Sequence, residues 1–316
     1  MELRDTLLND YQTFIRTREA LGYLGDKGTY YLRPFLEFCI ENYPEKFNTT
    51  KEMVDEWLLQ RRFKTNSTQS HAISDLRMFA RFQNTMGKAA YIPDEQYSLK
   101  IEKYRPYIFT DFELQTLFHA IDSIPPHFEA PNREIIVPLL FRMMFCCGMR
   151  PSEPLHLKLE DVNLDNGNIF IRQSKRKKDR RILMSEDLLQ LCRRYDAMIG
   201  PRECFFQKWD GGPLPTYWMT NQFRICWRNS GLEKRGIPRP YDLRHNYATR
   251  TLMRWIDEER DIMALLPYLS TYMGHQRFTH TLYYIHLLPE RLRMTAGIDW
   301  GKLDSIYEEV SVDEEN

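Results

Sequence analysis

Long apolar segments are missing from this sequence of 316 residues. A helix needs roughly 20 consecutive apolar residues to cross a bilayer, and runs such as residues 135–140 are far shorter. The first residues, MELRD, also lack the apolar stretch of a secretory signal. We therefore expect a cytoplasmic protein with no membrane partner.

Cysteine pairs with the spacing of a metal or redox site are missing as well. Cys146 and Cys147 are adjacent in an apolar, helix-like run, where we expect core packing rather than redox chemistry. With no CxxC pair, the sequence predicts reduced and mostly buried thiols at positions 39, 146, 147, 192, 204 and 226.

An excess of basic charge, the usual sign of a nucleic-acid partner, is missing from the total, since the net formal charge is zero. Residues 301–316 hold one lysine against six acidic residues, a balance of −5, so residues 1–300 carry +5. A neutral chain can therefore present a basic face, and a phosphate backbone responds to that face.

What the sequence does contain, over residues 3–84, is a helical pattern. Apolar residues recur at spacings of three and four, and Thr49-Thr50-Lys51-Glu52 reads as the capped start of a third helix. The pattern predicts a small bundle of four helices. Residues 87–106 then break the helical period with Pro93 and Pro106, which indicates an interdomain linker.

Beyond the linker the chain is expected to be mainly α with a small antiparallel sheet. Helical patterning resumes at Thr110 and includes a buried helix at 134–147 that ends at Gly148. Residues 201–215 have the composition of a loop. Short β-type segments around a DNGN turn predict three antiparallel strands, at residues 162–164, 169–171 and 181–184.

Four segments carry residues suited to phosphate chemistry. In GMRPSE, Arg150 lies at a corner between a helix that ends at Gly148 and one that starts near Pro151. In KRKKDRR, residues 175–181, dense basic charge between two strands suits phosphate contact, and a lysine there can reach a leaving oxygen. Taken alone, each also fits an ordinary surface salt bridge or a solvated hairpin.

The other two segments are RPYDLRH, which starts a helix with Tyr241 and Arg244 on one face, and YMGH followed by TLYYIHL. His275 and Tyr284 are nine residues apart, roughly 13 Å along a continuous helix. They can meet at one phosphate only if the helix breaks between them, with Thr279 or Thr281 as an N-cap. Structural packing explains each segment equally well when it is taken alone.

In this order and spacing the four segments resemble the tyrosine recombinase (phage integrase) family, over roughly residues 105–288. The approach LLPYLSTYMGH is most similar to recombinases of bacterial mobile elements. The resemblance implies site-specific recombination of double-stranded DNA in the nucleoid, with integration as one role. It also implies a helical core-binding domain at 1–86, a linker at 87–106, an α+β catalytic domain at 107–300 and a tail at 301–316.

The resemblance assigns roles by position. Arg150 and Arg244 match the two arginines that clamp the scissile phosphate, and His275 matches the histidine that hydrogen-bonds it. Tyr284 matches the nucleophile, because Ile285-His286-Leu287 follow it, and Tyr283 stays the alternative.

The lysine and the proton acceptor are less well defined. Lys175 best matches the catalytic lysine, with Lys177 and Lys178 left open. Tyr241 stands where the family usually has histidine, and a phenol with a pKa near 10 is a poor base at neutral pH. The group that accepts the Tyr284 proton is therefore undefined.

The implied reaction forms a 3′-phosphotyrosyl link and frees a 5′-hydroxyl without metal, ATP or another cofactor. A zinc site is not expected, because His275, His280 and His286 are loosely spaced. The implied partners are double-stranded DNA, a homotetramer on DNA and, as an option, an accessory directionality protein. The alternatives are a type IB topoisomerase, a telomere resolvase, and a DNA-binding regulator with an inactive site.

Two further expectations concern surfaces. The tail carries Leu303, Ile306, Tyr307 and Val310 at helical spacing, and it can dock on a neighbouring protomer or on its own domain. DNA contacts, or an ordinary solvated surface, are expected at Arg61, Arg62, Lys64, Arg77, Arg81, Arg176, Lys177 and Lys178.

Overall fold

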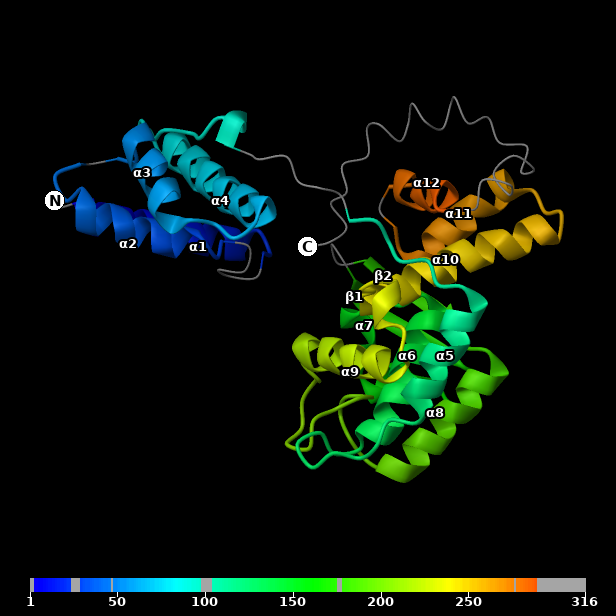
Figure 1. Ribbon diagram of the computed structural model, residues 1–316. Coiled ribbons are helices and arrows are strands. Elements are labelled where there is room, and N and C mark those ends of the chain that lie inside the picture. The colour runs from blue at the N-terminus through cyan, green and yellow to red at the C-terminus, as the bar shows by residue number, and fades with distance from the viewer. Residues whose placement is uncertain are drawn as a thin grey trace. The chain divides into compact units, whose positions relative to one another are not determined.

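The structure is a computed structural model that describes residues 3–23, 29–46, 48–97, 104–174, 178–275 and 277–288. The chain divides into two compact units, Met1–Tyr104 and Arg105–Asn316 (Figure 1). The tail at 301–316 and the basic residues 175–177 lie outside the described residues.

The first unit holds the four helices that the apolar spacing predicts: α1 (Leu3–Ala20), α2 (Leu32–Asn42), α3 (Lys51–Arg61) and α4 (Asn66–Thr85). The Thr50 hydroxyl accepts from the Met53 N–H, so the predicted N-cap of α3 is present. A short 3-10 helix, Glu95–Tyr97, follows. The helices bury an aromatic-rich core that includes Phe14, Phe35, Trp57 and Phe79.

The second unit is also mainly helical. Its helices are α5 (Asp111–Asp122), α6 (Arg133–Cys147), α7 (Ser152–Leu155), α8 (Glu186–Ile199), α9 (Thr216–Asn229), α10 (Pro240–Asp257), α11 (Ile262–Met273) and α12 (Thr279–His286). The short 3-10 helices Leu159–Asp161 and Glu233–Arg235 complete its helical content among the described residues. Its strands are β1 (Asn168–Ser174) and β2 (Lys178–Leu183), paired antiparallel.

Helix α6 lies in the larger apolar core, where it packs against α5, α8 and α10. It ends at Gly148, whose φ of 59° is left-handed. A Cβ at this position would lie 2.5 Å from Cδ1 of Tyr247, so both the backbone and the space require glycine. A second core joins α10, α11 and α12, which lie together at one end of the unit (Figure 1).

Two details differ from the sequence-based expectations. Residues 162–164 form no strand, because Val162 makes a single bridge to Ile169 and the Asn163 side chain then accepts two N–H groups that close a turn. The sheet in the described part therefore has two strands rather than three. Cys146 is exposed on α6 while the other five cysteines are buried, so core packing holds for Cys147 alone of that pair.

None of the described helices is both long and apolar enough to span a bilayer.

Candidate active site

Four helix ends and one strand bring the candidate residues together in the second unit. Arg150 follows the end of α6, Arg244 lies in the first turns of α10, His275 follows the end of α11, and Tyr284 is on α12. Strand β2 adds Arg180 to the same cluster. The structure thus assembles residues that are up to 134 positions apart in the sequence.

Arg244 is completely buried and bridges two helix ends. Its Nη1 donates to the Gly148 carbonyl at 2.5 Å and its Nη2 to the Met273 carbonyl at 2.7 Å. These carbonyls belong to the C-terminal ends of α6 and α11, where the helix dipole favours a cation. The C-terminal groups therefore stabilise this guanidinium in the interior.

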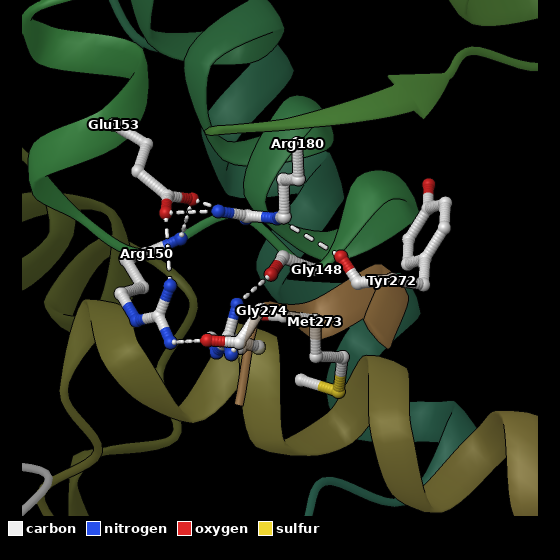
Figure 2. Close-up of polar contacts among 8 residues, drawn as sticks. Gly148, Arg150, Glu153, Arg180, Tyr272, Met273 and Gly274 are labelled. Carbon is white, nitrogen blue, oxygen red and sulfur yellow. Dashed lines mark hydrogen bonds and ion pairs between the residues drawn. The ribbon is translucent and has the colours of Figure 1, made fainter. Parts of the chain in front are cut away.

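Arg150 lies beside the same turn. Its Nη2 donates to the Gly274 carbonyl at 2.7 Å, and its backbone N–H donates to the Glu153 carboxylate at 2.8 Å (Figure 2). Burial, and then the neighbouring charge of Arg244, lower the pKa of the Arg150 guanidinium. Two cationic side chains are thus held close together, an arrangement that suits a doubly coordinated anion such as a phosphate.

Glu153 and Arg180 form a contact in the site that the sequence did not predict. Arg180 donates to both oxygens of the Glu153 carboxylate, each at 2.6 Å. Burial acts to raise the pKa of Glu153, but the hydrogen bonds and charge of Arg180, together with the charges of Arg244 and Arg150, outweigh it and hold the pKa at about 2. Glu153 also accepts from Arg150, and the three-residue spacing of these two residues at a helix start could have indicated this second contact.

The helix break between His275 and Tyr284 is present as predicted. Gly274, with a φ of 66°, ends α11, and α12 begins at Thr279. The N-cap assignment was wrong, because Phe278 holds that position without a side-chain hydrogen bond. Thr281 lies within the helix instead, and its Oγ1 is 2.8 Å from Nδ1 of His275.

Tyr284 is fully buried in this cluster. Its ring stacks on the His275 ring, with centroids 5.7 Å apart and planes at 21°, and also contacts His245 at 5.6 Å. Tyr283 is only half-buried. The geometry therefore groups Tyr284 rather than Tyr283 with the arginine and histidine side chains.

His245 was not singled out from the sequence. It lies one helical turn beyond Tyr241, with ring centroids 4.8 Å apart, and only 6% of it is exposed. Its Nδ1 is buried with no hydrogen-bond partner among the described residues. Burial, followed by the charges of Arg244 and Arg239, lowers its pKa to about 3, so the imidazole is neutral at pH 7.

The pKa of His275 is lowered well below its ordinary value of 6.5. Burial is the main cause, and the charges of Arg244 and Arg150 add to it. His275 is therefore also neutral at pH 7, and a neutral imidazole can donate one hydrogen bond and accept another.

The remaining predicted residues are less defined. Lys175, Arg176 and Lys177 lie outside the described residues, and only the backbone of Lys178 is described, where it pairs with Ser174 near the hairpin end. In the first unit Arg61, Arg62 and Lys64 are exposed near the end of α3. Arg77 and Arg81 border a hollow of about 520 Å³ on α4.

A larger hollow of about 1110 Å³ adjoins Arg150 and Tyr241. It extends over β1 and α9, and its lining is rich in cationic side chains, namely Lys158, Arg172, Arg224 and Arg239. The candidate site therefore opens onto a concave surface that can accommodate an anionic ligand much larger than a phosphate ion.

Comparison with known proteins identifies the family to which the protein belongs. The model of the phage integrase family matches residues 108–291, which is more than half of the chain. The chain belongs to this family. It is therefore an enzyme of the tyrosine-type recombinases, which act in DNA recombination.

Relatives match over nearly the whole chain. A protein of Sinorhizobium fredii strain NGR234 named integrase/recombinase y4rE is 27% identical over 302 residues, covering 90% of this chain and 93% of the relative. Tyrosine recombinase XerA of Pyrococcus furiosus is 24% identical over 299 residues, covering 92% and 93%.

The fold matches solved structures. XerH site-specific recombinase bound to difH substrate has a TM-score of 0.61 at 21% identity, covering 92% of this chain and 84% of that one. The Tn1549 transposon integrase in complex with transposon right end DNA has a TM-score of 0.60 at 15% identity, covering 88% and 94%.

Proposed function

We propose that this protein is a site-specific DNA recombinase that cuts and rejoins DNA strands through a covalent bond to Tyr284. The observation that carries the proposal is the stacking of Tyr284 on His275, beside the turn whose carbonyls hold Arg150 and Arg244. A nucleophile, two cations and a neutral hydrogen-bonding group thus lie within one cluster.

The chemistry is a transfer of a phosphoryl group between two oxygens. The Tyr284 oxygen attacks the scissile phosphorus, the bond from phosphorus to the 5′ oxygen breaks, and a 3′-phosphotyrosyl bond forms. A lysine of the 175–178 run, with Lys175 as the first candidate, gives the departing oxygen its proton. Rejoining reverses these steps with a 5′-hydroxyl as nucleophile, and the covalent link retains the free energy of the phosphodiester.

The two arginines make the attack feasible. Ionising a phenol with an ordinary pKa of 10 at pH 7 costs about 4 kcal/mol. Guanidinium groups at the phosphate favour the phenolate and stabilise the charge on the non-bridging oxygens. Tyr241 can donate a hydrogen bond to the phosphate but is a poor base, so the Tyr284 proton leaves by another route.

The first unit and the surface around the hollow are the proposed DNA-binding parts. XerH and the Tn1549 integrase were solved on DNA, which supports double-stranded DNA as the substrate. Exchange between two duplexes needs four strand cleavages, so we propose a ring of four protomers on DNA. The tail at 301–316 is a candidate contact between neighbours in that ring.

The test begins with the DNA itself. DNA that remains attached to the wild-type protein after denaturation is recovered from the cells that express it and sequenced, which defines the target. A nicked suicide duplex of that sequence should then trap the wild-type protein covalently. Tyr284→Phe should bind the duplex without forming the adduct, and Tyr283→Phe should form it.

The other outcomes identify the alternatives. An adduct that persists in Tyr284→Phe and is lost in Tyr283→Phe moves the nucleophile by one residue. Wild-type binding to a defined site without cleavage favours a DNA-binding regulator. Relaxation of a supercoiled plasmid that lacks the site favours a topoisomerase.

A further inference from the structure

Arg180 and Arg150 share one carboxylate unequally. Two Arg180 contacts to Glu153 are 2.6 Å long, whereas the contact from Nη1 of Arg150 is 3.1 Å long. All three side chains are nearly buried, with 7%, 5% and 12% exposure for Arg180, Glu153 and Arg150. A bidentate pair is the stronger arrangement, so Arg180 is the main partner of this carboxylate.

Arg180 also connects the carboxylate to the turn after α11. Its Nε donates to the Tyr272 carbonyl at 2.9 Å. A Cβ added to Gly274 would lie only 3.1 Å from Cδ of Arg180, so the side chain packs directly against this glycine. The Gly274 carbonyl in turn accepts from Arg150 (Figure 2).

These contacts close a ring through three chain segments. The ring runs from Arg150 to Glu153, across to Arg180 on β2, on to Tyr272 and Gly274, and back to Arg150 (Figure 2). Removal of Arg180 would leave Glu153 with Arg150 as its remaining cationic hydrogen-bond partner in the ring. The carboxylate could then take both donors of the Arg150 guanidinium and compete with a phosphate for them.

We propose that Arg180 is a positioning residue of the cleavage reaction: it occupies both oxygens of Glu153 and so keeps Arg150 able to exchange its weaker contact for a phosphate oxygen. This inference rests on the proposed function, because the phosphate in question is the scissile one. Arg180 touches neither the DNA nor the reacting atoms in this account and acts through Glu153 and Arg150.

The decisive variant is Arg180→Met, measured by single-turnover adduct formation on the suicide duplex at saturating protein. Loss of one well-placed donor to a transition state costs on the order of 10²-fold, and we expect a decrease of about that size. The dissociation constant for the duplex should change less than about threefold, because the many other phosphate contacts remain. Arg142→Met is the matched control, since Arg142 on α6 also donates to both oxygens of one carboxylate, that of Asp122, and has no assigned role in the site.

A second substitution separates positioning from general stability. Glu153→Gln added to Arg180→Met removes the competing charge but keeps an oxygen that can accept from the Arg150 N–H. The double variant should form the adduct roughly tenfold faster than Arg180→Met. Independent effects of the two substitutions would not give this coupling. The amplitude of the single turnover and the melting temperature report how much protein is folded.

Three results would overturn the inference while the wild type still forms the adduct. They are an Arg180→Met rate equal to that of Arg142→Met, a loss confined to the amplitude, and a loss that Glu153→Gln fails to relieve in folded protein. If Arg180→Met does not fold, Arg180→Lys keeps the charge without the bidentate geometry, and a rate equal to wild type would overturn the inference. An absence of adduct with the wild type would instead reject the proposed function.

Discussion

Nδ1 of His275 and Oγ1 of Thr281 are 2.8 Å apart, and the hydrogen bond between them spans the break between α11 and α12. Thr281 is completely buried, so this contact fixes the orientation of the imidazole, whose ring stacks on Tyr284. The orientation of His275, which is proposed to bind the phosphate, therefore depends on a residue that itself has no proposed contact with DNA.

Thr281→Val should consequently slow cleavage without abolishing it. The substitution keeps the shape but leaves a buried ring nitrogen without its partner, which costs about 1–3 kcal/mol and allows the imidazole to turn. We expect adduct formation to slow by roughly tenfold, the equivalent of about 1.4 kcal/mol in the barrier. Thr279→Val, two residues earlier on α12, is the control, and equal rates for the two variants would remove the role of Thr281.

His245 should make the folded protein sensitive to acid. Its pKa is about 3 in the folded state against an ordinary 6.5, so between these values the unfolded chain binds a proton that the folded chain does not. Stability therefore falls as the pH drops below 6.5, by up to about 1.4 kcal/mol per unit from this residue.

The test is His245→Asn, which removes the titrating group. The free energy of unfolding of each protein is measured by urea denaturation at pH 8, 7, 6 and 5. Above pH 7 it should change with pH by nearly the same amount in the wild type and the variant. Below it the wild type should lose about 2 kcal/mol more than the variant by pH 5. Identical slopes over the acid range would show that His245 is not held neutral by burial.

Gly148 should be the least replaceable of the helix-ending glycines described here. In Gly148→Ala, a left-handed φ is combined with a collision against the Tyr247 ring, so we expect a loss of about 3 kcal/mol or more. Gly87→Ala, after the end of α4, shares the positive φ but meets nothing within 4 Å, and should lose only about 1 kcal/mol. Chemical denaturation compares the two, and similar losses would contradict the packing argument.

The lysine that protonates the leaving oxygen can be identified through the leaving group. Lys175→Met should slow cleavage of the ordinary duplex by roughly 10²-fold, within the range for a general acid. A duplex with sulfur in place of the bridging 5′ oxygen should restore the rate, because a thiolate leaves without a proton. At saturating protein, Lys177→Met and Lys178→Met should cleave the ordinary duplex at the wild-type rate, with any effect confined to DNA affinity. If one of them shows the defect and the rescue instead, that lysine is the acid.

The sequence predicted the helices well because apolar spacing records which face is buried. The four helices of the first unit and the buried helix ending at Gly148 follow from that pattern alone. The prediction of a strand at 162–164 was wrong because the alternation of apolar and polar residues there is too short to distinguish a strand from a turn closed by the Asn163 side chain.

Site residues were predictable where an ordered motif carried them and unpredictable where only the fold joins them. The motifs GMRPSE, DLRH and YMGH predicted Arg150, Arg244 and His275, and the fold brings these three residues together. Nothing in the sequence links Glu153 to Arg180, 27 residues away, because their contact depends on β2 lying against the end of α11. His245 was not predicted for the same reason, since its burial comes from packing against α12.

The most direct test of the central claim is to locate the covalent bond to DNA. Wild-type protein trapped on the suicide duplex is digested with nuclease and protease, and the modified peptide is sequenced by mass spectrometry. A nucleotide attached to Tyr284 is the predicted result. A nucleotide on Tyr283 or on any other residue, or an unmodified peptide from protein that has cut the duplex, would contradict the account.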